Sequence, residues 1–175
     1  AYALVAVWHV VGEPSYLAAK IFTVLCWLIS VLALAHLTWQ FTKHQGSAAA
    51  AALLWLVLAK YYPLINHNSF SSYLAIIWLW VAWQLERSTK AWHYTALGII
   101  TLLVLTCLQT KGVALGIVGI GLVVSRRQWL TLVFYSGTVL LGCLSLLFIW
   151  PVSALWANLV LLPFQTSYLA INHAD

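Results

Sequence analysis

Residues 105–124 read LTCLQTKGVALGIVGIGLVV, and the prediction of the fold starts from them. It consists of two apolar runs separated by a short polar group that contains a single lysine, Lys111. A charged side chain is costly inside a bilayer, whereas one at the boundary can extend its ammonium to the headgroups. The stretch therefore predicts two helices that meet at or near the edge of a membrane.

Glycines follow Lys111 at positions 112, 116 and 119. Spacings of four and three residues put them on one face of a helix, and small residues let a neighbouring helix approach closely. The pattern predicts helix packing that would support the turn that carries Lys111.

The composition of the whole chain agrees with a membrane protein. Of 175 residues, 64% are hydrophobic and 6% are charged, whereas about a quarter are charged in a soluble domain. Apolar runs recur along the whole length, so a signal peptide or a single anchor cannot explain them. We predict an all-α polytopic bundle, with residues 1–175 forming a single transmembrane domain. Because the chain begins at Ala1 and lacks methionine, we expect an internal piece of a longer protein.

Polar and helix-breaking residues divide the chain into six predicted crossings. The runs are 15–41, 48–62, 72–85, 91–108, 112–125 and 129–150, with partial helices at 1–11 and 152–162. The segment LINHNSFSS, residues 64–72, is predicted to be a loop because it is rich in Asn and Ser. Some runs are short for a hydrocarbon core about 30 Å thick. We therefore expect a water-filled recess near this loop and QTKG, residues 109–112.

Basic residues predict the orientation of the bundle. One face would carry Lys43, Arg87, Lys90, Arg126 and Arg127, and the other Lys20, Lys60 and Lys111. The first face is predicted to be cytoplasmic, because Lys and Arg accumulate there. Tryptophans at 39, 83, 92 and 129 would lie at the inner boundary, and those at 8, 150 and 156 at the outer one. We expect a bacterial-type inner or plasma membrane, with the functional face extracytoplasmic.

Chemistry is expected at the outer face. Lys111 either extends to the interface as a topology signal or binds an anionic lipid headgroup. Lys60 and His67 are candidates for the same phosphate-binding role, although an interfacial cap and loop would explain them as well. Glu13 is the candidate within this chain for a general base, although Gly-Glu-Pro also forms a plain turn. The other candidate cavity residues are Asn66, Asn68, Gln109 and Thr110.

Several functional classes find no support in the sequence. It contains no P-loop, G-x-S-x-G motif or zinc-type histidine spacing. The cysteines at 26, 107 and 143 are predicted to be small buried hydrophobes, and the histidines at 9, 36, 44, 93 and 173 to be isolated packed or interfacial residues. No cofactor is predicted; a divalent metal is conceivable, but no site for one occurs in this chain. Basic residues scattered at the ends of apolar runs favour membrane lipids as partners and argue against nucleic acid.

Three stretches resemble the membrane part of the polyprenyl-phosphate-sugar-dependent glycosyltransferases of GT-C type, which include protein O-mannosyltransferases and aminoarabinose transferases. These are residues 12–21, residues 48–82 and, most specifically, residues 97–129. The third is similar to the family's order of an apolar run, L-T-K-G, an apolar run and a basic cluster. Thr110-Lys111-Gly112 matches the T-K-G core of that order.

The resemblance implies a glycosyltransferase that uses a polyprenyl-phosphate-linked sugar on the extracytoplasmic side. Its basic residues would bind the phosphate, and a catalytic aspartate would lie in a first outer loop, which is expected before Ala1. The chain departs from the family at residues 68–72, where an acidic residue is often found. The acceptor is left open, and the remainder of the polypeptide or other membrane subunits are expected partners. The alternative is a non-catalytic membrane subunit or transporter component with structural lipid contacts.

Overall fold

The computed structural model describes residues 16–60, 67–85, 90–125, 129–149 and 151–153. Regular structure in these ranges is entirely helical, which confirms the all-α prediction. In chain order the helices are α2 (Tyr16–Thr42), α3 (Gln45–Lys60), α4 (His67–Leu85), α5 (Ala91–Cys107), α6 (Gln109–Ser125) and α7 (Trp129–Ile149).

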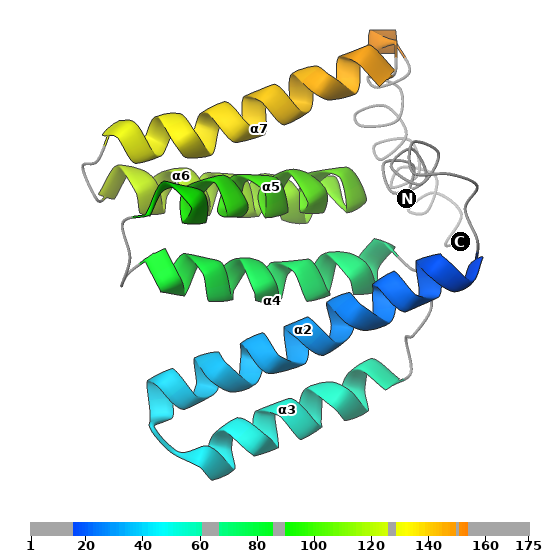
Figure 1. The fold of residues 1–175 in the computed structure, drawn as a ribbon, viewed down its shortest axis with the longest axis vertical. Coiled ribbons are helices and arrows are strands. Elements are labelled where there is room, and N and C mark those ends of the chain that lie inside the picture. Colours follow the sequence, from blue (N-terminus) through cyan, green and yellow to red (C-terminus); the bar gives the residue numbers. More distant parts are fainter. Residues whose placement is uncertain (1–15, 61–66, 86–89, 126–128, 150, 154–175) are drawn as a thin grey trace, which may run out of the picture.

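Successive helices run in opposite directions, as Figure 1 shows. Helix α2 packs between α3 and α4, and α4 packs in turn on α5. Helix α5 also contacts both α6 and α7, so it lies at the centre of the second half of the bundle. This alternation puts Lys43 and Lys90 at one end of the bundle, and the starts of α4 and α6 at the other.

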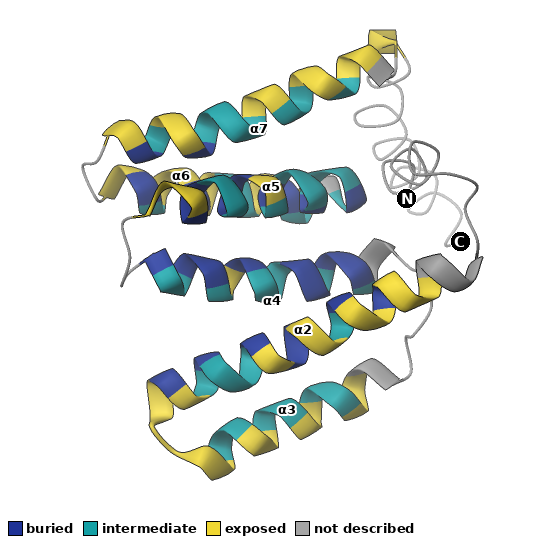
Figure 2. Ribbon diagram, viewed as in Figure 1, coloured by how far each residue is buried: buried dark blue, intermediate teal, exposed yellow. Residues whose placement is uncertain are grey.

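Two buried clusters hold the helices together. One contains Trp78 of α4, Tyr94 and Leu97 of α5, Val123 of α6 and Tyr135 of α7. The other joins residues of α2, α4 and α5: Cys26, Phe70, Tyr73, Leu74, Val104 and Cys107. Both cores lie between helices, and the faces turned away from them are exposed (Figure 2).

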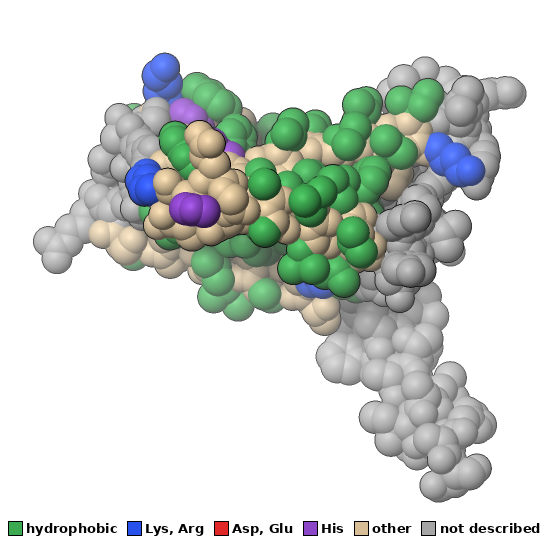
Figure 3. All heavy atoms as spheres, turned by 90° about the horizontal axis from the view of Figure 1, so that it is seen from below, with side chains coloured by type: hydrophobic (Ala, Val, Ile, Leu, Met, Phe, Trp, Pro, Cys, Tyr) green, Lys and Arg blue, Asp and Glu red, His purple; other side chains and the backbone are tan. Residues whose placement is uncertain are grey.

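The exposed surface of the helices is largely apolar. Leu53, Leu54 and Val57 of α3 are exposed, as are Leu140 and Leu141 of α7. Figure 3 shows hydrophobic side chains along the α3 side of the bundle. An exterior of this kind suits hydrocarbon rather than water, because soluble proteins rarely expose large continuous apolar patches.

Within the part of the chain that the structure describes, two segments are long and apolar enough to cross a membrane, Lys20–Thr42 and Trp129–Phe148. The apolar helices between them are shorter: Gln45–Leu58, Ser69–Leu85, Ala91–Cys107 and Thr110–Ser125. A crossing usually needs about 20 residues, with a lower limit near 17. Length and composition are therefore consistent with a membrane protein, whereas six complete crossings stay a prediction.

Two predicted non-helical stretches are helical instead. The loop prediction for residues 64–72 is wrong from His67 onward, because α4 begins there. Asn and Ser favour helix starts as well as loops, and here they occupy the first turns of a helix. The residues QTKG form the first turn of α6, which therefore begins at Gln109 rather than at the predicted residue 112. Helix α3 likewise begins at Gln45, ahead of the predicted start at residue 48.

Leu108 separates α5 from α6 with a single extended residue, at φ −148° and ψ 103°. Its N–H donates to the carbonyl oxygen of Val104, and its own carbonyl accepts from the N–H of Gly112 at 3.0 Å. Helix α6 thus starts directly after α5 ends. A side chain at position 112 would collide with the backbone of Leu105, so glycine is required for this close approach.

Candidate anionic-headgroup site

The ammonium of Lys111 lies against the first turns of α4. Its Nζ donates to Ser72 Oγ at 2.9 Å and to Ser71 Oγ at 3.3 Å. Ser71 is fully buried, and Lys111 is half-buried. These three residues form what we call the Lys111 site.

The start of α4 is fixed in place by aromatic packing. Phe70 and Tyr73, on either side of the two serines, are both buried in the cluster shared by α2, α4 and α5. The Phe70 ring lies 5.7 Å from that of Phe22 on α2, and Trp55 of α3 contacts the Tyr73 ring edge-on. The serine hydroxyls are therefore presented by a packed helix.

The lysine side of the site is supported by glycine packing, as the spacing of glycines predicted. Gly112 sits against the backbone of Leu105, and Gly119, two turns further along α6, leaves room for the hydroxyl of Tyr135. Gly116 lies 3.8 Å from Thr101 Cγ2, measured from the position that a Cβ would take. The face of α6 that carries the glycines thus packs on α5 and α7, while Lys111 reaches across to α4.

The chemistry of the Lys111 site is that of a cation with hydroxyl groups. No Asp or Glu occurs in the described ranges of the chain, so the described groups around the ammonium are not carboxylates. No cluster of metal-ligating side chains occurs there either. A lysine ammonium is a compact charge with several donors, and serine hydroxyls can also donate to anionic oxygen. Such a set can bind a phosphate or another oxyanion.

The predicted site residues fall into three groups. Lys111 is at the site, and Thr110 precedes it as an exposed residue of the same turn. His67 and Asn68 begin α4, Gln109 begins α6 and Lys60 ends α3, but the structure describes the backbone rather than the side chains of these residues. Glu13 and Asn66 lie outside the described residues. The structure therefore brings the starts of α4 and α6 together, through Lys111 and two serines.

Sequence reasoning missed Ser71 and Ser72 because they were assigned to a loop. Their position at the start of an apolar run could have indicated them. A serine hydroxyl there lies near the membrane boundary, where it can contact a lysine of another helix. The sequence predicted His36 to be a packed or interfacial residue, and it is packed, but its hydrogen bond to another helix was not foreseen. Trp80 Nε1 of α4 donates to His36 Nδ1 at 2.9 Å.

Comparison with known proteins adds no relative: no family model, no curated protein and no solved structure matches the chain.

Proposed function

We propose that this chain is the membrane segment of a glycosyltransferase that takes a sugar from a polyprenyl-phosphate donor on the extracytoplasmic side. The observation that supports the proposal is the pairing of Lys111 with Ser71 and Ser72 at one end of the bundle. In this role the ammonium stabilises the negative charge of the departing lipid phosphate. The T-K-G similarity around Lys111 points to the same ligand.

The bundle exterior suits the rest of such a donor. Its polyprenyl tail would lie along the apolar outer surface, while its phosphate lies at the depth where α4 and α6 begin. The proposal places the remaining crossings in the shorter helices, whose flanking polar residues shorten the apolar length that is required. The general base would be a carboxylate outside the described residues, where Glu13 is a candidate.

Phosphate binding can be tested with the full chain in lipid nanodiscs. A short-chain polyprenyl phosphate should bind, and the uncharged polyprenol of the same length should bind at least tenfold more weakly. Replacement Lys111→Ala should weaken binding of the phosphate by about 10- to 100-fold, because a charged hydrogen bond contributes about 1.5–3 kcal/mol. Lys111→Arg should retain part of the affinity. Native mass spectrometry would count the bound lipid.

Lys43→Ala is the matched control, because it removes a lysine from the opposite end of the bundle. Equal loss of affinity in Lys43→Ala and Lys111→Ala would indicate general attraction to a basic protein and would remove Lys111 from the mechanism. Transfer is tested separately, with a polyprenyl-phosphate sugar and the longer native polypeptide. Phosphate binding without transfer in the unmodified protein would favour the non-catalytic membrane subunit.

A further inference from the structure

A second polar group lies at the opposite end of the bundle, where α2 meets α4. His36 accepts a hydrogen bond at Nδ1 from Trp80 Nε1 (2.9 Å), and its Nε2 lies 3.2 Å from the amide nitrogen of Gln40. The ammonium of Lys43 in turn donates to Gln40 Oε1 at 3.1 Å. These four residues, which we call the His36 cluster, form one continuous chain of contacts. The Trp80–His36 contact is the link of the chain that joins two helices.

The end of α2 is arranged to place Lys43 in this chain. Lys43 follows the helix in the left-handed region, at φ 54°, and its N–H donates to the carbonyl oxygen of Trp39 at 2.8 Å. A residue with a side chain adopts this conformation at a cost of about 1 kcal/mol. The ammonium folds back over the helix end, 5.4 Å from the centroid of the Trp39 ring. The strained backbone therefore keeps the charge beside Gln40.

Counting protons shows that the contacts cannot all be hydrogen bonds at once. Trp80 has an N–H but no acceptor, so His36 Nδ1 must carry a lone pair, and a neutral imidazole then has its proton on Nε2. For that proton to form a hydrogen bond, Gln40 must present its amide oxygen to His36. The amide nitrogen of Gln40 would then face the ammonium of Lys43, and both of these groups are donors. With the amide turned the other way, Lys43 is satisfied but two donors face each other at His36 Nε2.

A further proton on His36 would break the link between the helices. Doubly protonated imidazole is a donor at both nitrogens, so Nδ1 could no longer accept from Trp80. We propose that the His36 cluster is a proton-sensitive tie between α2 and α4, formed while His36 is neutral and lost when His36 is protonated. The tie is thus present at higher pH and is lost as the pH falls and His36 takes up its second ring proton.

The charged and titratable groups near His36 are few. Lys43 directly follows α2, and His44 comes next, with its Nδ1 accepting a hydrogen bond from the N–H of Ser47. Between Gln45 and its last residue, Lys60, α3 has no ionisable side chain, and α4 has His67 and Tyr73 in its first half, toward the other end of the bundle. Lys43 is therefore the described charge most directly linked to His36.

The tie can be tested by NMR on the full chain in nanodiscs, labelled with ¹⁵N in tryptophan and histidine. The Trp80 indole signal is assigned by its loss in Trp80→Phe. Between pH 8 and pH 5, the indole proton of Trp80 should shift upfield with the same midpoint as the His36 ring nitrogens. At pH 8 the His36 Nδ1 should show the chemical shift of an unprotonated nitrogen.

Two variants make the linkage quantitative. Trp80→Phe removes the N–H that donates to the neutral ring, and Lys43→Met removes the cation that donates to Gln40, so each should change the midpoint of the pH-dependent His36 signal. His44→Gln, which changes an exposed histidine two residues beyond α2, should leave it unchanged. The proposal is overturned if the Trp80 signal stays constant while His36 titrates, if His36 does not titrate between pH 5 and 8, or if Nδ1 is protonated at pH 8. These outcomes are read from the wild-type chain, and Trp80→Phe is needed only to assign the Trp80 signal.

Discussion

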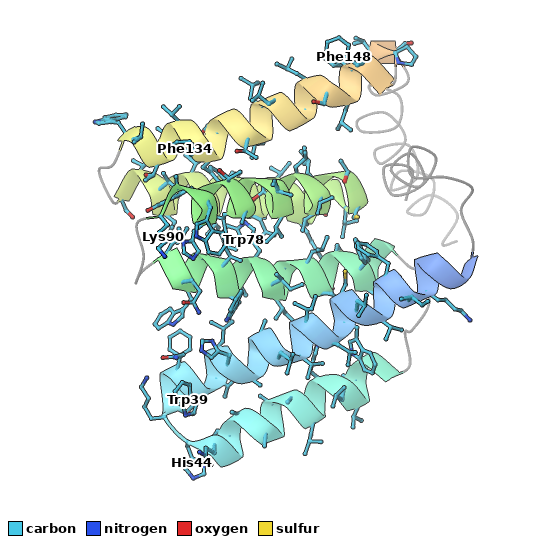
Figure 4. The ribbon with its side chains drawn as sticks, viewed as in Figure 1. Trp39, His44, Trp78, Lys90, Phe134 and Phe148 are labelled. Atoms are coloured by element: carbon cyan, nitrogen blue, oxygen red, sulfur yellow. The ribbon has the colours of Figure 1, made fainter. Side chains whose placement is uncertain are left out.

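Thr101 of α5 has a buried hydroxyl that links three helices through hydrogen bonds. Trp78 Nε1 of α4 donates to Thr101 Oγ1 at 2.8 Å, and the Tyr135 hydroxyl of α7 lies 3.1 Å from the same oxygen. The Thr101 hydroxyl donates to the carbonyl oxygen of Leu97 at 2.8 Å, so the tyrosine acts as donor to Thr101. Trp78, which lies between α4 and α5 in Figure 4, and Tyr135 are both almost fully buried. A single small side chain thus satisfies two large aromatic ones.

We therefore expect Thr101→Val to destabilise the bundle although it preserves shape. The change leaves the indole N–H of Trp78 and the hydroxyl of Tyr135 without their acceptor, and each buried donor left unsatisfied costs about 1–3 kcal/mol. The free energy of unfolding should fall by about 2–6 kcal/mol in total, as measured by reversible denaturation in mixed micelles. Thr95→Val on the same helix is the control, since Thr95 bonds only weakly to its own helix, at 3.4 Å to Ala91. Equal losses in the two variants would contradict the role assigned to Thr101.

At the scale of the helices, glycine decides how closely α6 approaches its neighbours. A Cβ at Gly119 would collide with the hydroxyl of Tyr135, and one at Gly112 with the backbone of Leu105. Gly121 lies on the same helix, but a Cβ there would meet no atom within 4 Å. The same helix therefore offers both crowded positions and an open one.

Replacement of these glycines by alanine should have opposite effects on stability. Gly121→Ala should be neutral or should stabilise by up to about 1 kcal/mol, because alanine favours a helix interior more than glycine does. Gly112→Ala should destabilise by more than 1 kcal/mol, since backbone rather than a flexible side chain must move. Gly119→Ala should displace the Tyr135 hydroxyl and so also weaken its stabilising hydrogen bond to Thr101. Thermal unfolding of the variants in one detergent provides the comparison, and a stabilising Gly112→Ala would contradict the close packing of α5 and α6.

The extent of each helix was largely predictable, because apolar runs and polar breaks mark their ends. Helix α7 begins at the predicted residue, and α2 and α5 agree to within one residue at each end. The start of α4 was not predictable from composition, since Asn and Ser suit both a loop and a helix terminus. For this reason, only part of the Lys111 site could be predicted from the sequence. The lysine and its glycines stood out between apolar runs, whereas its serine partners depend on which helix lies beside α6.

At the scale of the whole molecule, the neighbour relations between helices explain what the sequence could not reveal. Hydrophobic patterns show which segments are buried or lipid-facing, but in an apolar bundle most faces look alike. The contact of α5 with α7, across the chain order, and that of His36 with Trp80 both depend on packing between distant segments. The alternation of helix direction could be predicted, and it determines which helix ends lie together at each end of the bundle (Figure 1).

Alternation leads to a direct test of which helices cross the membrane. His44, Lys90 and Thr110 are exposed at helix ends, and single cysteines can be placed at each in a chain whose three native cysteines are replaced by alanine. If α3 and α4 both cross, a membrane-impermeant maleimide should label His44→Cys and Lys90→Cys from the same side. If α5 also crosses, Thr110→Cys should be labelled from the opposite side, and Trp129→Cys from the side of Lys90 if α6 crosses. Permeabilised membranes, in which all four positions should react, provide the control. Labelling of Lys90→Cys and Thr110→Cys from one side would show that α5 does not cross, and it would remove the Lys111 site from the face proposed for the lipid phosphate.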